Sequence, residues 1–198
     1  MADQETLAVY AKRAADYAKR FGKAGEGPHM KAFLAEVPDG GRILDLGCGP
    51  GHTAAAMKQA GLLVDALDAS PELAQIAREQ YDVNVRVATF ADLDAVGTYD
   101  GVFANFSLLH APKADMPDHL SRIAYALVPR GVLHIGLKQG TGEKRDAIGR
   151  FYAYYEMDEL KGLLADTGFH VISERTGAEE GLDGTVAPWM ILLARKHD

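Results

Sequence analysis

The chain has 198 residues, 47% of them hydrophobic, which suits one α/β domain with a sizeable core and requires no second domain. Its formal net charge of −7 opposes binding to a long polyanion such as nucleic acid. The single cysteine, Cys48, excludes an internal disulfide, no Cys/His spacing of a metal site is present, and a reducing cytoplasm is the expected location.

The N-terminal segment is predicted to form an amphipathic helix. Residues 4–21 place apolar side chains such as Leu7, Tyr10, Ala14 and Tyr17 at steps of three and four residues. Charged residues interrupt this segment, so we expect no signal peptide. No apolar run reaches the roughly 20 residues that span a bilayer, and we expect a soluble protein with no membrane contact.

Apolar strands then alternate with helical segments. Ser70 is the expected N-cap of the second helix, since Pro71 follows it at the first helical position. This alternation predicts a doubly wound parallel sheet. The expected strands are 42–46, 62–67, 83–88 and 99–105, and the expected helices between them are 53–60 and 71–81.

The C-terminal half continues the pattern with one interruption. We expect a helix over 116–127, a strand over 131–137 that opens at a glycine, and a helix over 157–166. Between this strand and the helix over 157–166, residues 139–156 interrupt the alternation of strands and helices. They are predicted to form a lid-like insertion over the site. Two closing strands, 169–174 and 188–196, are joined by the glycine-rich link 181–184 and suggest an antiparallel pair at one end of the sheet.

Together these elements define the expected fold class. It is an α/β, three-layer, doubly wound and mostly parallel seven-stranded sheet, with an antiparallel strand near the C-terminus. Residues 1–198 form a single domain in this interpretation. Residues 1–30 form an N-terminal helical cap, and the lid-like insertion completes the domain.

A loop with glycine at every second position follows the first strand. Gly47, Gly49 and Gly51 lack the Cβ atoms that would hold a ligand away from the backbone. A dinucleotide fingerprint G-x-G-x-x-G would need glycine at position 52, which is His52. Asp45 precedes the loop by two residues, where a carboxylate would repel a pyrophosphate but could anchor the ammonium of an amino-acid-like group.

A second carboxylate lies about 20 residues after the loop. Asp68 ends the second strand, at the spacing from which an acid binds ribose hydroxyls. Asp65 lies inside the same strand and is the weaker candidate. Ligands of doubly wound sheets bind beyond the carboxyl ends of the strands, where both the loop and Asp68 are expected.

These motifs resemble those of a known superfamily. Residues 45–51 together with Asp68 resemble motifs I and II of the class I S-adenosylmethionine-dependent methyltransferases. Residues 99–105 resemble the fourth-strand motif, and 127–133 resemble the L-x-P-G-G-x-L entry to strand five, with Arg130 in place of a glycine that should alter only a turn. The chain is most similar to small bacterial enzymes of the tellurite-resistance type. The resemblance implies a Rossmann-like methyltransferase fold and a transferase that uses S-adenosylmethionine and releases S-adenosylhomocysteine.

The resemblance also implies a set of cofactor contacts. Tyr10 and Tyr17 of the first helix would close over the methionine part, although core-facing aromatic residues are the ordinary alternative. The other implied contacts fall into three groups. Those near the methionine part are Asp45, Gly47, Cys48, Gly49, Gly51 and Asn105. Asp68 would bind the ribose, and Ala69, Thr89 and Phe90 would lie near the adenine.

Methyl transfer by in-line displacement depends mainly on positioning the acceptor. His110 follows the fourth strand and is the candidate catalytic base, which is needed only if the nucleophile arrives protonated; a packing or capping histidine is the alternative. A substrate wall is expected from Lys138, Arg150, Tyr152 and Tyr155, against the alternative of a partly packed, solvated connection.

The acceptor is expected to be a small molecule. Amino-methyltransferases of nucleic acids usually carry Asn/Asp-Pro-Pro-Tyr after the fourth strand, whereas 105–108 here read Asn-Phe-Ser-Leu. The alternative is an NAD-dependent oxidoreductase. Its dinucleotide site would need glycine in place of His52, and the Asp45 carboxylate would repel the pyrophosphate. A non-catalytic regulator that binds S-adenosylmethionine is a further alternative. The expected assembly is a monomer or a homodimer.

Overall fold

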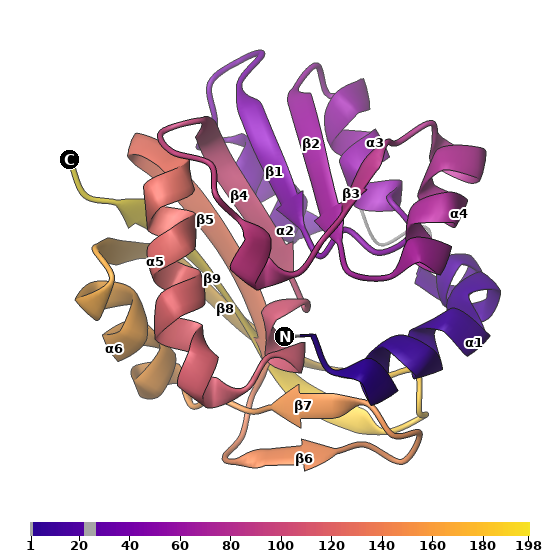
Figure 1. Ribbon diagram of the computed structural model, residues 1–198. Helices are drawn as coiled ribbons and strands as arrows, with labels where there is room; N and C mark the ends of the chain where they lie inside the picture. The colour runs from indigo at the N-terminus through magenta and orange to yellow at the C-terminus, as the bar shows by residue number, and fades with distance from the viewer. Residues whose placement is uncertain (1, 22–26) are drawn as a thin grey trace.

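The computed structural model describes residues 2–21 and 27–198. Its main sheet has seven strands in the order β3-β2-β1-β4-β5-β9-β8 (Figure 1). All neighbours pair in parallel except β9, which is antiparallel to both β5 and β8. This confirms the predicted fold class. The strands are β1 Arg42–Leu46, β2 Leu63–Asp68, β3 Val85–Val87, β4 Tyr99–Asn105, β5 Leu127–Lys138, β8 Phe169–Glu180 and β9 Val186–Lys196.

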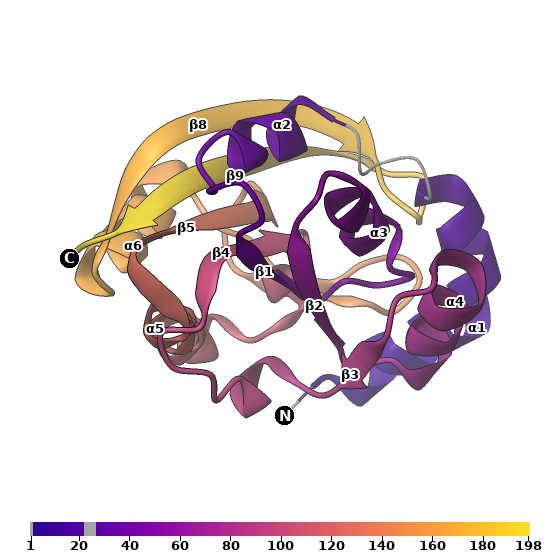
Figure 2. The same ribbon diagram turned by 90° about the horizontal axis from the view of Figure 1, so that it is seen from above.

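Helices cover both faces of this sheet, which gives three layers (Figure 2). Alternate strand residues point to opposite faces, so Ile43 packs with α2 and α3, whereas Leu44 packs with α5 and α6. No helix of the described residues is long and apolar enough to cross a membrane. The helices are α1 Gln4–Phe21, α2 Pro28–Leu34, α3 His52–Gln59, α4 Pro71–Tyr81, α5 Met116–Ala126 and α6 Met157–Asp166.

The predicted helix and strand bounds agree closely where the local pattern is strong. The helices over 4–21, 71–81 and 157–166 and the strands over 42–46 and 99–105 are confirmed. Ser70 caps α4, since its hydroxyl accepts a hydrogen bond from the backbone N–H of Leu73 at 3.2 Å. The expectation over 83–88 was too long, because only Val85–Val87 pairs with β2.

Three differences arise from long-range pairing. β5 begins at Leu127 rather than at Gly131, because Leu127 already pairs with Tyr99 across a bulge. β8 continues to Glu180, since β9 pairs with it along its whole length. The insertion over 139–156 forms a hairpin of β6 Glu143–Arg145 and β7 Phe151–Ala153, which is separate from the main sheet. The short helix α2 was not predicted.

Two segments lie across the carboxyl ends of the parallel strands. α1 runs beside α4, and the β6–β7 hairpin lies next to the start of α1 (Figure 1). Most of the core is formed by apolar residues of the central strands and of α5 and α6. The site therefore lies between the carboxyl ends of the parallel strands on one side and α1 with the β6–β7 hairpin on the other.

Candidate active site

A cavity lies at the carboxyl ends of β1, β2 and β4 and has a volume of about 890 Å³ including its open mouth. Ten of the residues expected at the site line this cavity. They are Tyr10, Tyr17, Gly47, Gly49, Asp68, Ala69, Thr89, Phe90, Asn105 and His110.

The glycine loop forms part of the cavity because its backbone adopts conformations that favour glycine. Gly47 and Gly49 have φ angles of 76° and 54°, in the left-handed region. A Cβ on Gly47 would lie 2.2 Å from the Cβ of Ser107, so glycine allows the loops after β1 and β4 to pack together. At Gly49 a Cβ would point toward Tyr17, whose Cε1 atom would be 3.6 Å away. The loop thus leaves open backbone facing the cavity.

Gly51 has a different role from the other two glycines. It is the N-cap of α3, with a φ of 83°, and does not line the cavity. A Cβ there would lie 2.7 Å from the Cβ of Ala77 on α4. The structure therefore places Gly51 in helix packing rather than beside the ligand space.

Asp68 joins the glycine loop to the end of β2. Its Oδ2 accepts a hydrogen bond from the backbone N–H of Gly49 at 2.8 Å, and its Oδ1 accepts one from Ser70 at 2.9 Å. Burial raises the pKa of Asp68, and the backbone donors partly offset that effect. The carboxylate lies in the cavity wall with lone pairs left for ligand hydroxyl groups.

Asp45 and Cys48 lie behind the cavity wall. Both are buried, and neither lines the cavity. The Oδ2 atom of Asp45 has no hydrogen-bond partner among the described residues. Burial and the nearby charge of Asp68 raise the pKa of Asp45 to about 8. Burial likewise raises the pKa of the Cys48 thiol, which makes Cys48 unsuited to act as a nucleophile.

A buried histidine orients the amide of Asn105 at the end of β4. Nε2 of His134 lies 3.0 Å from Oδ1 of Asn105. The ring of His134 stacks on Phe103 at 4.0 Å, and burial lowers its pKa to about 3, so the ring is neutral. The amide carbonyl therefore accepts from His134, which leaves the amide N–H donors of Asn105 for the cavity.

The next residue, Phe106, is in an unusual backbone conformation. Its φ is 55°, a left-handed value that is rare for a residue with a large side chain. Its N–H is bonded to the carbonyl of Gly136 at 2.9 Å, which fixes the turn. Strain of this kind is typical of functional sites. Phe106 lines the cavity, and its position directly after β4 is the one signal that could have pointed to it.

His110 lies in the cavity wall, and both of its ring nitrogens are hydrogen-bonded. Nδ1 is 2.7 Å from the carbonyl oxygen of Phe151, so Nδ1 carries the proton and donates it. Nε2 is 2.9 Å from the hydroxyl of Tyr10 and accepts from it. Burial lowers the pKa of His110 to about 4. This arrangement favours a positioning role over the expected role of a base.

Arg150 completes the same chain of hydrogen bonds. Its Nη1 donates to the Tyr10 hydroxyl at 3.1 Å, while Nε donates to Asp146 at 2.8 Å. The guanidinium also lies over the rings of Tyr10 and Tyr152. Its donors are thus engaged within the protein, and Arg150 does not line the cavity. The expectation that it forms a substrate wall is not met in this geometry.

The other expected substrate residues also lie outside the cavity wall. Tyr155 is fully buried in the main core, and Tyr152 is 7% exposed and packs edge-to-face with His110 at 4.8 Å. Lys138 is 9% exposed, with Nζ 5.6 Å from the ring centre of Phe106. None of the described cavity-lining residues comes from 139–156. The insertion contacts the site through α1 and His110 instead of covering the cavity directly.

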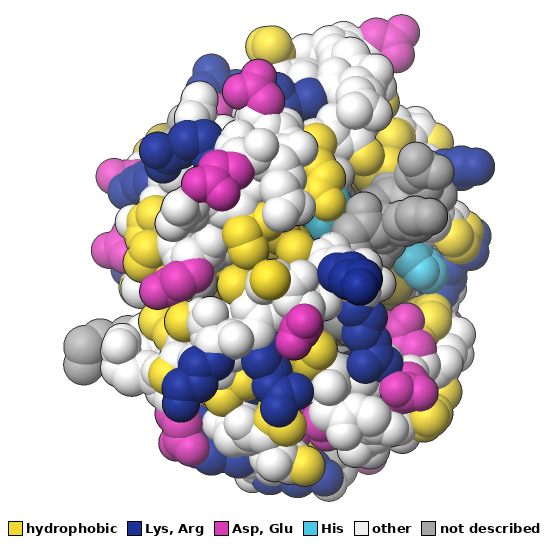
Figure 3. All heavy atoms as spheres, turned by 90° about the vertical axis from the view of Figure 1, so that its right-hand side faces the viewer, with side chains coloured by type: hydrophobic (Ala, Val, Ile, Leu, Met, Phe, Trp, Pro, Cys, Tyr) yellow, Lys and Arg dark blue, Asp and Glu magenta, His cyan; other side chains and the backbone are white. Residues whose placement is uncertain are grey.

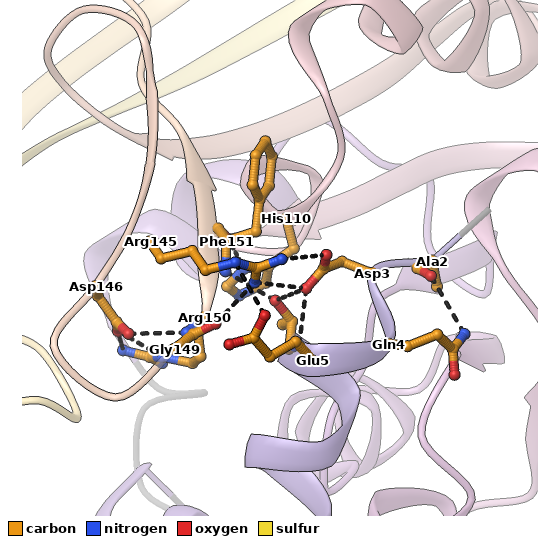
Figure 4. A network of polar contacts seen from close by, with 11 residues as sticks. Ala2, Asp3, Gln4, Glu5, His110, Arg145, Asp146, Gly149, Arg150 and Phe151 are labelled. Atoms are coloured by element: carbon orange, nitrogen blue, oxygen red, sulfur yellow. Dashed lines mark hydrogen bonds and ion pairs between the residues drawn. The ribbon is translucent and has the colours of Figure 1, made fainter.

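A polar network fastens the hairpin to the start of α1 (Figure 4). Arg145 donates from Nη1 and Nη2 to the two carboxylate oxygens of Asp3, at 3.0 and 2.9 Å. The N–H and hydroxyl of Thr6 both donate to Asp3, and that hydroxyl accepts from the N–H of Phe151 at 2.8 Å. The hydrogen bond from Arg145 keeps the pKa of Asp3 well below its usual range. We call these residues, Asp3, Thr6, Arg145 and Phe151, the N-terminal latch.

Sequence reasoning missed several residues of the cavity. Ser107 is one, with its hydroxyl donating to the carbonyl of Leu46 at 2.6 Å and so joining the ends of β4 and β1. The others come from the start of the chain through α1, from the start of α4, from the loops after β3 and β4, and from the region before and within α5, where periodicity signals only packing. They are Ala2, Asp3, Thr6, Leu7, Ser70, Leu73, Ala91, Phe106, Ala111, Asp115 and His119.

The arrangement fits S-adenosylmethionine in three respects. Gly47 and Gly49 expose backbone, Asp68 offers a carboxylate at the end of β2, and Asp45 has an unpaired buried oxygen behind the loop. Strand order, the antiparallel β9 and this loop define the class I S-adenosylmethionine-dependent methyltransferase fold. S-adenosylmethionine is the cofactor that this class uses.

Comparisons with known proteins agree with this class. Residues 43–131 match a family described as a methyltransferase domain. The chain is 27% identical over 128 residues to an uncharacterized methyltransferase of Staphylococcus carnosus, covering 64% of this chain and 60% of that protein. It is 31% identical over 151 residues to an O-methyltransferase of Pyrenophora dematioidea, covering 67% of this chain and 55% of that protein. The chain thus spans a little over half the length of these relatives.

A solved structure covers the whole chain. It is the 1,6-didemethyltoxoflavin-N1-methyltransferase of Burkholderia thailandensis, crystallised with 1,6-didemethyltoxoflavin and S-adenosylhomocysteine. The two structures superpose with a TM-score of 0.78 at 24% sequence identity. The match covers 100% of this chain and 92% of the Burkholderia chain. The chain therefore has the fold of the class I S-adenosylmethionine-dependent methyltransferases, and its residues 43–131 match a methyltransferase domain. Its resemblance to enzymes of the tellurite-resistance type stays a prediction.

Proposed function

We propose that the protein transfers a methyl group from S-adenosylmethionine to a small-molecule acceptor. The observation that carries this proposal is Asp68, which is held by the N–H of Gly49 at 2.8 Å and lies in the wall of the cavity. That link fixes a carboxylate and an open backbone loop relative to each other before any ligand binds. Preorganised groups of this kind lower the entropic penalty of binding.

Each part of the cavity has an assigned partner in this proposal. Gly47, Gly49 and the oriented amide of Asn105 hold the methionine part, and Asp68 accepts hydrogen bonds from the ribose hydroxyls. Ala69, Thr89 and Phe90 contact the adenine, while Tyr10 and Tyr17 close the cavity from α1. Asp45, Cys48 and Gly51 act from behind the loop, by charge and by packing.

When bound, S-adenosylmethionine supplies a methyl group on a positively charged sulfur that is already a good leaving group. The protein therefore has to align the acceptor and exclude water, and alignment alone can contribute several kcal/mol. α1, fastened by the N-terminal latch, provides the covering element. Phe106 and the rings of α1 provide the walls against which an acceptor is oriented.

A small acceptor agrees with the charge and with the relatives. The net charge of −7 opposes nucleic acid, and basic and acidic side chains are interspersed on the face drawn in Figure 3. One relative is named an O-methyltransferase, and the Burkholderia enzyme was crystallised with a small heterocycle. We further propose a single-domain cytoplasmic enzyme, monomeric or homodimeric, that needs neither nucleic acid nor a membrane.

Equilibrium binding of S-adenosylhomocysteine tests the proposal. Asp68→Asn should weaken binding by roughly 100-fold in calorimetry, because the uncharged amide loses charge-assisted hydrogen bonds to the ligand and to Gly49. Asp65→Asn is the matched control, since Asp65 lies on the same strand in a half-exposed ion pair with Arg42 and should leave affinity unchanged. Binding of NAD without S-adenosylhomocysteine would contradict the proposal. Binding without turnover of any acceptor would indicate a regulator.

A further inference from the structure

A second histidine lines the cavity, and one of its ring nitrogens has no partner. His119 lies on α5 and is 7% exposed. Its Nδ1 is buried and makes no hydrogen bond to any of the described residues, in contrast to both nitrogens of His110. Burial lowers the pKa of His119, so its ring is neutral at pH 7 and can carry its proton on either nitrogen. A buried polar atom without a partner is unfavourable, so a ligand that bonds to Nδ1 would be stabilised.

The neighbour of His119 in the cavity wall is a residue assigned to the adenine. The rings of His119 and Phe90 meet edge-to-face, with their centres 5.6 Å apart. Phe90 follows β3 and also lies next to the glycine loop, since its Cε1 atom would be 3.5 Å from a Cβ on Gly47. In the proposed function Phe90 contacts the adenine. An adenine bound against Phe90 would therefore have the His119 ring beside it.

The acidic side chain that follows Phe90 in the loop after β3 is engaged elsewhere. Oδ2 of Asp92 accepts hydrogen bonds from the N–H and the hydroxyl of Thr89, at 2.8 and 2.7 Å. Thr89 and Asp92 thus form a capping box around the turn Phe90–Asp92. Asp92 is exposed and does not line the cavity. Its carboxylate therefore shapes the loop, and an acid that faces a ligand at this end of the cavity has to come from another element.

Asp115 supplies such an acid one helical turn before His119. It is the N-cap residue of α5 and lines the cavity together with His119. Residues four positions apart face the same side of a helix. The Asp115 carboxylate is half-buried and makes no hydrogen bond or ion pair with the described residues. The two residues thus offer a carboxylate, which only accepts hydrogen bonds, beside a ring that can accept or donate.

We propose that Asp115 and His119 recognise the amino edge of the adenine of the cofactor. This inference rests on the proposed function and names the residues that select the nucleobase. The exocyclic amino group of adenine donates to the Asp115 carboxylate, and the ring nitrogen next to it accepts a hydrogen bond from Nδ1 of His119. Two groups that lack a partner in the protein each gain one in this arrangement. α5 therefore provides the acidic contact that Asp92 cannot provide while it is bonded to Thr89.

An analogue in which oxygen replaces the amino group tests the inference without turnover. Binding of S-adenosylhomocysteine and of S-inosylhomocysteine is compared by calorimetry. We expect the wild-type protein to bind the inosyl analogue about tenfold more weakly or worse, because the Asp115 carboxylate then faces an oxygen lone pair. Asp115→Asn should reduce this preference to about twofold or less, since an amide can donate to the oxygen. Asp118→Asn is the matched control, because Asp118 lies on the same helix in an exposed ion pair with Arg122.

Variants of His119 have a different signature. Its neutral ring can donate to adenine or accept from the N–H of hypoxanthine, so both ligands bond to it. His119→Leu should therefore weaken both ligands by roughly tenfold. His119→Asn should restore much of this affinity, because its amide places a polar atom near the position of Nδ1. A residue that only packs against Phe90 would show no such rescue.

The outcomes separate the two proposals. A wild-type protein that binds neither ligand would argue against the proposed function. Equal affinity for the two ligands would overturn the inference and leave the proposed function intact, and this comparison does not depend on the folding of a variant. A preference that persists in a folded Asp115→Asn protein, or unchanged affinities in a folded His119→Leu protein, would overturn the role assigned to that residue. Thermal unfolding shows whether each variant is folded.

Discussion

The hydroxyl of Tyr10 and Nε2 of His110 lie 100 residues apart in the chain and 2.9 Å apart in space. This contact joins the covering helix α1 to the loop that follows β4. Because Arg150 of the hairpin donates to the same hydroxyl at 3.1 Å, one atom connects three separate segments around the cavity. A substitution that removes the Tyr10 hydroxyl is therefore expected to affect α1, the β6–β7 hairpin and the loop after β4 together.

Tyr10→Phe should destabilise the protein while sparing cofactor binding. The change keeps the ring but leaves the buried Nε2 of His110 and Nη1 of Arg150 without this partner, which is expected to lower the free energy of unfolding by about 1–3 kcal/mol. Urea denaturation measures this loss. Tyr125→Phe is the control, because Tyr125 is 70% exposed and should behave as wild type. Equal stability of the two variants would show that the contact contributes nothing.

Arg145→Met should open the N-terminal latch. Without its two hydrogen bonds to Asp3, the first turn of α1 should exchange its amide hydrogens faster, as measured by mass spectrometry on residues 2–10. Since Arg145 lowers the pKa of Asp3, the latch should be strong above pH 4 and weaken as the pH falls further. Arg86→Met, which breaks a surface ion pair with Asp94, should leave exchange in this segment unchanged.

Asp45→Asn should remove a pH-dependent loss of stability. The folded protein raises the pKa of Asp45 from 3.8 to about 8, so between these values the native state binds more protons than the unfolded chain. Stability from this group therefore falls as the pH rises from 4 to 8. The difference in unfolding free energy between Asp45→Asn and wild type should grow over that range. A difference that is constant with pH would contradict the shifted pKa.

Arg130→Gly should stabilise the protein. Arg130 has a φ of 61°, in the left-handed region that glycine adopts without strain, and its ion pair with Asp198 is long and exposed. The gain should be about 1 kcal/mol in urea denaturation. Arg130→Ala separates backbone from side chain, because alanine keeps the strain while losing the guanidinium. Similar gains from both substitutions would show that the arginine side chain, rather than the backbone, is responsible.

Local sequence patterns predicted most of the fold. Apolar runs marked β1 and β4 at their correct bounds, and the cap formed by Ser70 with Pro71 marked the start of α4. These signals depend on residues a few positions apart, so they can be read without knowing the fold. The same holds for the glycine loop and Asp68, whose spacing predicted that they would meet at one sheet edge.

Tertiary structure decided which candidate side chains reach the cavity. Tyr155 and Arg150 were expected at the substrate wall, yet one is in the core and the other is held by Asp146 and Tyr10. Hydrophobic and charged residues in an irregular segment give no periodic signal of direction, because their orientation depends on distant partners. The hairpin β6–β7 and its contact with α1 are consequences of such pairing.

The sequence by itself determined the class of the protein: an alternation of strands and helices, a glycine loop, and a carboxylate at the next strand end. Only the tertiary structure decided that His110 has both nitrogens bonded, that Asp45 lies behind the loop, and that Lys138 is buried outside the cavity wall. The physical reason is that spacing along the chain fixes backbone geometry, whereas protonation and burial depend on atoms that folding brings together from segments 100 or more residues apart.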